Sequence, residues 1–213
     1  FLEVAYLLIE GELPNEKQLS EFNENIRKHT LVAEDMRKFY QAFPHHAHPM
    51  GVLGSLVNSL SSFYPESQDP TRGEDAVDLT IHRLIAKVPT LAAWSHKNAQ
   101  RHPVVYPKNE LNYSENFLQM MFSVPSEEYE IDPVIAKALD LLFILHADHE
   151  QNCSASTVRI VGSSQANLYA SISAGISALW GPLHGGANQA VIEMSEDIKA
   201  DGGDVTKYLD KAK

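Results

Sequence analysis

Cysteine is almost absent from this chain of 213 residues, in which Cys153 is the single example. One thiol cannot form an internal disulfide, so we expect a reducing, cytoplasmic compartment. Positive charge is also scarce, because 17 Lys and Arg stand against 28 Asp and Glu, a formal net charge of −11. Binding to a nucleic-acid backbone needs clustered cations, and this balance argues against such a partner.

Long hydrophobic runs are missing as well. The longest strongly apolar run, residues 141–145, is far shorter than the roughly 20 residues that cross a bilayer, so we expect no membrane partner. Hydrophobic residues still make up 44% of the chain, which is enough to bury a core. The chain begins at Phe1 on a helical pattern and stops at Lys213 in a charged segment, so we expect a piece of a longer polypeptide.

Strand patterns are nearly absent, and apolar residues recur with the period of an α-helix, which predicts an all-α fold. We expect helices over residues 1–10, 18–42, 50–63, 75–87, 91–100, 113–122, 133–149, 165–180 and 187–200. Pro89 should separate two of them, since proline breaks a helix interior. The helix over 165–180 is rich in Ala, Ser and Gly, which predicts a buried helix in a crowded bundle or a subunit interface.

A loop with few side chains surrounds His184. Gly181 precedes it, and Gly185 and Gly186 follow it, in the segment WGPLHGGANQAVIEM. Glycine lets a ligand approach the backbone, and a helix that begins near Ala187 offers free N–H groups that favour negative charge. A histidine held there can donate a hydrogen bond to a carbonyl oxygen as charge builds on it. The alternative is a structural turn whose histidine caps the helix.

A second polar segment, LLFILHADHEQN, places His146 and His149 three residues apart, on one face of the predicted helix. Zinc binding is one interpretation, but the zinc helix has the pattern His-Glu-x-x-His, and no nearby Cys or His supplies an obvious third ligand. The other interpretation is a polar helix end that faces a cleft, where one histidine holds a carboxylate or a carbonyl group.

Three further polar groups have simple structural explanations. The histidines of PHHAHPM fit solvation and helix capping better than metal binding. RIVGSSQAN has the Gly-Ser-Ser pattern of a helix entry and an anion nest, without the lysine of a nucleotide-binding P-loop. Arg83 and Lys87 lie four residues apart, and these two cations repel each other unless an anion lies between them. We expect a solvated face there.

The combination of HADHEQN, VGSSQAN and GPLHGGAN closely resembles citrate synthase, and HADHEQN resembles the bacterial, Gram-negative-type members of that family. The resemblance extends over essentially the whole chain, from FLEVAYLLIEGELP through VYPKNELNYSENFLQMMF. It implies the condensation of acetyl-CoA with oxaloacetate and water to give citrate and CoA. Acetyl-CoA is then a co-substrate, and no metal or redox cofactor is implied.

The resemblance also implies roles for single residues. His184 is similar to the histidine that stabilises the enol or enolate of acetyl-CoA. His149 is similar to the histidine that binds oxaloacetate, and His146 supports it, so we expect His149 outward and His146 packed. Gram-negative members are hexamers that NADH inhibits at a site remote from catalysis. The residues that resemble parts of that site are Arg83, Lys87, Lys28, His29 and Tyr64.

Other residues of the family pattern have no counterpart before Lys213. These are a second catalytic histidine in a Gly-x-Gly-His segment, a catalytic aspartate, and the arginines that bind the dicarboxylate. The resemblance assigns residues 1–185 to most of a large helical domain and 186–213 to the start of a small hinged domain. We therefore expect the isolated chain to be inactive and its parent polypeptide to be active as a homodimer or hexamer.

Three alternatives stay open at this point. A 2-methylcitrate synthase has the same fold and uses propionyl-CoA as donor. A non-catalytic helical binding or assembly module follows if the chain naturally ends at Lys213. A metal-dependent hydrolase is the third.

Overall fold

The computed structural model describes residues 1–203, 205, 206, 208 and 209, and over this range it is helical, without strands. The helices are α1 (Leu2–Glu10), α2 (Glu16–Lys28), α3 (Met36–Ala42), α4 (Pro49–Phe63), the short 3-10 helix η1 (Pro65–Gln68), α5 (Glu74–Ala99), α6 (Tyr113–Phe122), α7 (Pro133–Leu145), α8 (Cys153–Gly162), α9 (Leu168–Leu179) and α10 (Gly185–Ala200). The predicted all-α fold class is confirmed.

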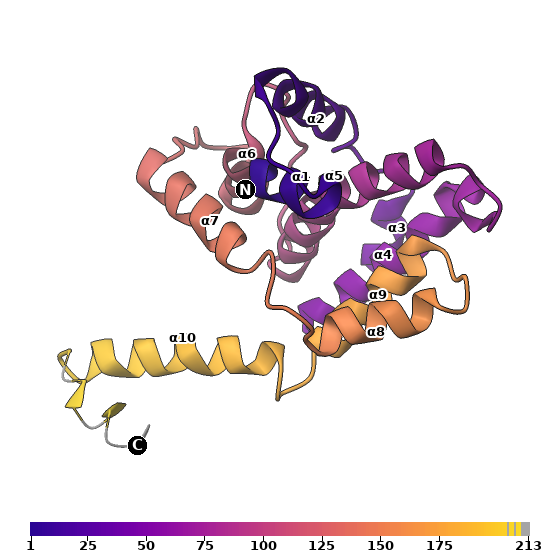
Figure 1. The fold of residues 1–213 in the computed structure, drawn as a ribbon. Helices are drawn as coiled ribbons and strands as arrows, with labels where there is room; N and C mark the ends of the chain where they lie inside the picture. The colour runs from indigo at the N-terminus through magenta and orange to yellow at the C-terminus, as the bar shows by residue number, and fades with distance from the viewer. Residues whose placement is uncertain (204, 207, 210–213) are drawn as a thin grey trace.

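The long helix α5 runs through the body of the molecule (Figure 1). It contacts α2, α3, α4, α6 and α9, while α8 packs on α9 and α7 on α6. The main core lies between α3, α4, α5 and α9 and includes Met36, Leu56, Leu91, Trp94 and Tyr169, all fully buried. Burying a side chain of this size contributes about 1.5–3 kcal/mol. A smaller cluster joins α1 and α2 to α5.

The predicted break at Pro89 is wrong, because α5 continues through it from Glu74 to Ala99. Proline has no N–H to donate to the carbonyl of residue i−4, here Ile85. The hydroxyl of Tyr113, at the start of α6, donates to this carbonyl oxygen at 3.0 Å. A contact from another helix thus satisfies the group that the proline leaves free.

The predicted single helix over 18–42 is also wrong, since α2 ends at Lys28 and α3 begins at Met36. Side chains of α5 donate hydrogen bonds to the carbonyl groups of the connecting loop. Lys87 Nζ donates to the carbonyls of His29, at 2.7 Å, and Leu31. Thr90 Oγ1 donates to the carbonyl between them at 2.8 Å. The local pattern of apolar residues holds no sign of this tertiary contact.

Helix α8 was not predicted, and the Gly-Ser-Ser part of RIVGSSQAN marks the exit from α8 rather than a helix entry. Asn152 caps α8 by accepting a hydrogen bond from the N–H of Ala155 at 2.9 Å. Gly162 ends the helix, and Gln165 then takes a left-handed backbone conformation with φ of 63°. Asn167 caps α9 in turn, so the segment is the turn between two helices.

The small residues of α9 allow close packing on two sides. Ser173 Oγ donates to the carbonyl of Gly54 in α4 at 2.7 Å, and Ser154 Oγ of α8 donates to the carbonyl of Gly175 at 2.9 Å. A Cβ at position 175 would lie 2.7 Å from Cγ2 of Val158. The predicted helix in a crowded bundle is therefore confirmed.

Gly175→Ala in the full-length protein should lower the free energy of unfolding by about 1–3 kcal/mol, the usual cost of overpacking. Val158 is β-branched and has little rotamer freedom to move away. Gly162→Ala is the matched control, because its Cβ would meet only Ser171 Oγ, at 3.9 Å. Urea denaturation measures both. Equal losses in the two variants would contradict a specific α8–α9 contact.

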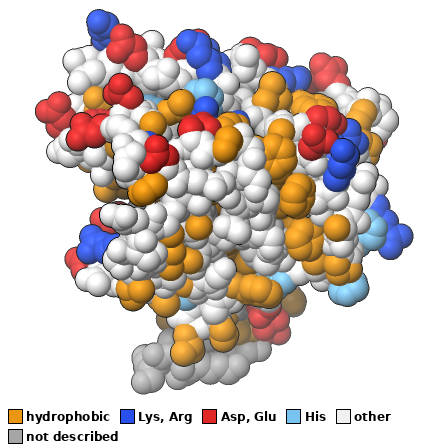
Figure 2. All heavy atoms as spheres, turned by 90° about the vertical axis from the view of Figure 1, so that its right-hand side faces the viewer, with side chains coloured by type: hydrophobic (Ala, Val, Ile, Leu, Met, Phe, Trp, Pro, Cys, Tyr) orange, Lys and Arg blue, Asp and Glu red, His pale blue; other side chains and the backbone are white. Residues whose placement is uncertain are grey.

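Many large apolar side chains remain exposed. They include Val134, Ile135, Leu141, Leu142 and Leu145 of α7, Ile160 of α8, Leu183, and Val191, Ile192 and Met194 of α10. Figure 2 shows hydrophobic side chains spread across the middle of one face, with charged side chains gathered near its top. In Figure 1, α10 extends away from the body of the molecule, and none of its residues is buried. Among the described residues, no helix is both long and apolar enough to cross a membrane.

Candidate functional site

His184 lies at the end of a tight loop between α9 and α10. The carbonyl oxygen of Gly181 accepts hydrogen bonds from the N–H groups of His184, at 3.0 Å, and of Gly186, at 3.2 Å. A Cβ at position 185 would overlap the carbonyl oxygen of Leu179, so this position excludes every residue except glycine. His184 makes no side-chain cap on α10, which argues against the capping alternative.

Ser154, near the start of α8, is the hydrogen-bond partner of the His184 ring. Its Oγ lies 2.9 Å from His184 Nε2 and 2.9 Å from the carbonyl oxygen of Gly175. The hydroxyl has one hydrogen, which it gives either to Gly175, with Nε2–H then donating to Oγ, or to Nε2. In the second arrangement the neutral ring carries its proton on Nδ1, where it can be donated to a ligand.

Sequence analysis did not identify Ser154. The contact joins residues 30 positions apart, on a helix that was not predicted. The available signal was the pattern Asn-Cys-Ser after HADHEQ, since Asn152 is a strong helix-capping residue.

His146 and His149 do not share a helical face, because α7 ends at Leu145 and His146 is its C-cap. Asp148 Oδ1 accepts a hydrogen bond from the N–H of Glu150 at 2.9 Å, and Glu150 has φ of 55°. This local turn competes with the helix and stops it. The two histidine rings lie edge to face, with centroids 5.8 Å apart.

Both residues are exposed, so the expected packing of His146 is wrong, and the exposure of His149 agrees with the outward orientation expected of it. His146 Nδ1 lies 2.8 Å from the carbonyl oxygen of Leu142, which can only accept, so Nδ1 carries a hydrogen. Among the described residues, none is hydrogen-bonded to the ring of His149. Within the part of the chain that is described, no hydrogen bond or ring contact joins His149 to His184.

Four of the five residues expected at a remote anion site lie together. The guanidinium carbon of Arg83 is 4.1 Å from the ring centroid of Tyr64, and Lys87 Nζ is 5.6 Å from it. Lys87 also bonds to the carbonyl of His29. Lys28 does not join them, since its Nζ pairs with Glu24 Oε1 at 3.4 Å.

This cationic cluster, Arg83, Lys87, Tyr64 and His29, is not the solvated face that the spacing suggested. Lys87 is 3% exposed, and burial, followed by the charge of Arg83, lowers its pKa to about 8. Burial, followed by the charge of Lys87, also lowers the pKa of His29. Arg83 Nη1 donates to Glu66 Oε1 at 2.5 Å, so a carboxylate of the same chain occupies one side of the cluster.

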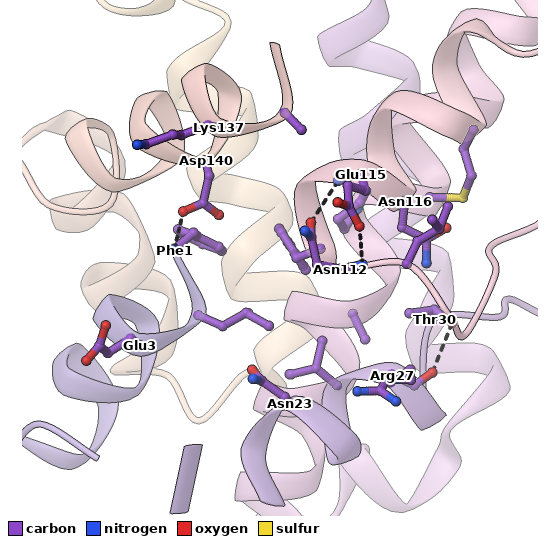
Figure 3. Close-up of a pocket in the computed structure, with 18 of the residues that line it drawn as sticks. Phe1, Glu3, Asn23, Arg27, Thr30, Asn112, Glu115, Asn116, Lys137 and Asp140 are labelled. Atoms are coloured by element: carbon purple, nitrogen blue, oxygen red, sulfur yellow. Dashed lines mark hydrogen bonds and ion pairs between the residues drawn. The ribbon is translucent and has the colours of Figure 1, made fainter. Parts of the chain in front are cut away.

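A cavity of about 490 Å³ is not lined by His184. Figure 3 shows it between α1, α2, α6 and α7, with several of its polar groups paired with one another. Asp140 bonds to the amino group of Phe1 at 2.8 Å, and Asn112 and Glu115 form a capping box at the start of α6. None of the predicted site residues lines this cavity. The described residues include no group of three or more His, Cys, Asp or Glu placed to hold a metal ion.

Comparisons with known proteins agree with this geometry. A family model for the C-terminal domain of citrate synthase matches residues 1–213. Citrate synthase 1 of Mycobacterium tuberculosis strain H37Rv is 55% identical over 213 residues, and the citrate synthase of Corynebacterium glutamicum is 56% identical over 214. Each alignment covers 100% of this chain and 49% of the relative, so the chain spans about half the length of these curated relatives.

Solved structures give the same result for the fold. The citrate synthase of Pyrobaculum aerophilum superposes with a TM-score of 0.78 at 31% identity, over 92% of this chain and 49% of that one. The citrate synthase of Thermotoga maritima has a TM-score of 0.77 at 26% identity, over 99% of this chain and 52% of that one. With the sequence matches, these similarities show that the chain belongs to the citrate synthase family.

Proposed function

We propose that the polypeptide of which this chain forms part condenses acetyl-CoA with oxaloacetate and water, releasing citrate and CoA. The observation that carries the proposal is the tight loop of His184, in which Gly185 packs against the carbonyl oxygen of Leu179 and Ser154 holds the ring at 2.9 Å. A thioester carbonyl can approach such a loop closely. We propose that the protein acts in the cytoplasm and uses acetyl-CoA as a co-substrate, without a metal or redox cofactor.

In the proposed mechanism, a carboxylate from the rest of the polypeptide removes a methyl proton from acetyl-CoA. Negative charge then builds on the thioester oxygen, and His184 Nδ1–H donates a hydrogen bond to it. In this mechanism the hydroxyl of Ser154, which donates to the carbonyl of Gly175 in the structure, turns its single hydrogen to Nε2 when the thioester binds, and so fixes this tautomer. The enol carbon attacks the ketone of oxaloacetate, which His149 binds with support from His146. Water then cleaves the thioester.

We further propose that residues 1–185 form most of a large domain and that residues 186–213 begin a smaller hinged domain. The support is that α10 starts at Gly185 and extends from the body with no buried residue. Exposed apolar side chains on α7 and α10 support burial against the rest of the polypeptide and a homodimer or hexamer.

The acyl donor separates the proposed function from 2-methylcitrate synthase. The full-length protein should use acetyl-CoA with a kcat/KM about tenfold or more above that for propionyl-CoA, since one methylene is worth about 1–3 kcal/mol in such discrimination. Release of CoA from each thioester with saturating oxaloacetate measures the ratio. A ratio that favours propionyl-CoA would make 2-methylcitrate synthase the better description.

We also propose that NADH binds at the cationic cluster and inhibits the enzyme. Arg83→Ala in the full-length protein should raise the NADH concentration for half-inhibition by about tenfold or more, because a hydrogen bond to a charged group contributes about 1.5–3 kcal/mol. Lys28→Ala is the matched control, since that side chain pairs with Glu24. It should change the value less than twofold. NADH inhibition that is unchanged in Arg83→Ala would exclude the cluster as the regulatory site.

A further inference from the structure

Trp180, the C-cap residue of α9, is held against the N-terminal end of α4. Its indole ring stacks on the imidazole of His48, with centroids 4.9 Å apart and an interplanar angle of 24°. A Cβ at Gly51 would lie 3.1 Å from Cη2 of the indole, so the ring lies directly against the backbone of α4. The indole is therefore fixed by two contacts although it is 48% exposed.

The same tryptophan is connected to His184 by a short, internally bonded turn. Trp180 N–H donates to the carbonyl of Ile176, the last step of the helix, and Gly181 supplies the carbonyl that accepts from His184 and Gly186. No residue between Trp180 and His184 is buried. Leu183 is 100% exposed, and Pro182 is exposed as well.

Open space lies beside the loop. A cavity of about 290 Å³ borders the stacked pair and is also lined by Gly185, Gly186 and Asn188. Without the stack, the loop could move into this space and take the imidazole of His184 away from Ser154.

We propose that His48 and Trp180 are positioning residues for His184. The inference rests on the proposed catalytic role of His184. The stack fixes the start of the loop at Trp180. The carbonyl of Gly181, the next residue, accepts the hydrogen bond from the N–H of His184 and so ties the position of His184 to that of Trp180. Ser154 holds the imidazole ring by its Nε2. Neither residue has to touch a substrate for this effect, because a displacement of a catalytic group by about 1 Å can cost on the order of 100-fold in rate.

Two substitutions at His48 separate the stack from the second role of this residue. His48 Nδ1 accepts a hydrogen bond from the N–H of Met50 at 3.2 Å and so caps α4. His48→Asn keeps a capping acceptor and removes the stacked ring. His48→Phe keeps an aromatic ring and removes the cap.

In the full-length protein, His48→Asn should lower kcat by about 10- to 100-fold and leave the KM for oxaloacetate within about twofold. His48→Phe should keep kcat within about threefold of the wild type. Trp180→Ala should match His48→Asn, and Trp180→Phe should recover part of the loss. Phe122→Ala is the control, because Phe122 is also half-exposed, at 52%, and packs on a histidine, His96, at 6.1 Å. It should leave kcat unchanged.

A second measurement does not depend on activity. The ring ¹H–¹⁵N signals of His184 should shift in His48→Asn and stay in place in His48→Phe. The inference would be overturned if kcat fell in His48→Phe, which lacks the cap, and not in His48→Asn, which lacks the ring. Equal His184 signals in the two variants would also overturn it. If His184→Ala itself keeps full activity, the proposed function fails, and the ring signals alone then decide whether the stack positions the loop.

Discussion

His184→Ala in the full-length protein is expected to lower kcat by about 10²–10³-fold, the usual cost of removing one preorganised oxyanion donor. The hydrogen bond strengthens as charge builds on the thioester oxygen, so its loss should raise the barrier more than it weakens substrate binding. The KM for oxaloacetate should therefore change little. Initial rates of CoA release, at several concentrations of each substrate, measure both parameters.

The control for this prediction is His46→Ala, which removes an exposed loop histidine. It should keep the kcat of the wild type. Ser154→Ala should give an intermediate result, because the imidazole stays but loses the hydrogen bond that fixes its tautomer. We expect a loss of about tenfold, the worth of one neutral hydrogen bond. If His184→Ala retained the kcat of the wild type, the histidine would have no catalytic role.

The helical period predicted several elements well because their apolar faces are buried by ordinary packing. The range 113–122 coincides with α6, and 50–63 differs from α4 by one residue. The prediction failed where a distant side chain decides the local structure. The hydroxyl of Tyr113 donates to the carbonyl that Pro89 leaves free within α5, and Lys87 donates to a carbonyl of the loop that follows α2. Such contacts have no periodic signature in the sequence.

The parts of the candidate site that depend on local backbone geometry were predictable from the sequence. The parts that depend on tertiary contacts were not. Gly185 is required by the carbonyl of Leu179, so the glycine pattern around His184 is visible in the sequence. Ser154 reaches His184 only because α8 packs on α9. Likewise, the sequence alone suggests that Arg83 and Lys87 are exposed cations. In the structure both lie over the ring of Tyr64, and Arg83 also pairs with Glu66.

The isolated chain of residues 1–213 should show no catalytic release of CoA from acetyl-CoA and oxaloacetate. In the proposed mechanism His184 and Ser154 stabilise charge on a thioester oxygen, but that charge arises only when a base removes the methyl proton. The family resemblance places this aspartate, a second catalytic histidine and the dicarboxylate-binding arginines beyond Lys213. Without the base, proximity and hydrogen bonding have no proton transfer to assist.

The assay must allow for Cys153, which is a free and exposed thiol. A thiol reagent would react once with it, so only CoA release beyond one equivalent per chain counts as turnover, and Cys153→Ser removes the background. The full-length protein is the positive control and should turn over many times under the same conditions. Sustained turnover by residues 1–213 alone would mean that a carboxylate within them acts as the base, and the assignment of the missing groups to the rest of the polypeptide would be wrong. A stable oligomer that binds neither oxaloacetate nor CoA would instead favour the helical assembly module.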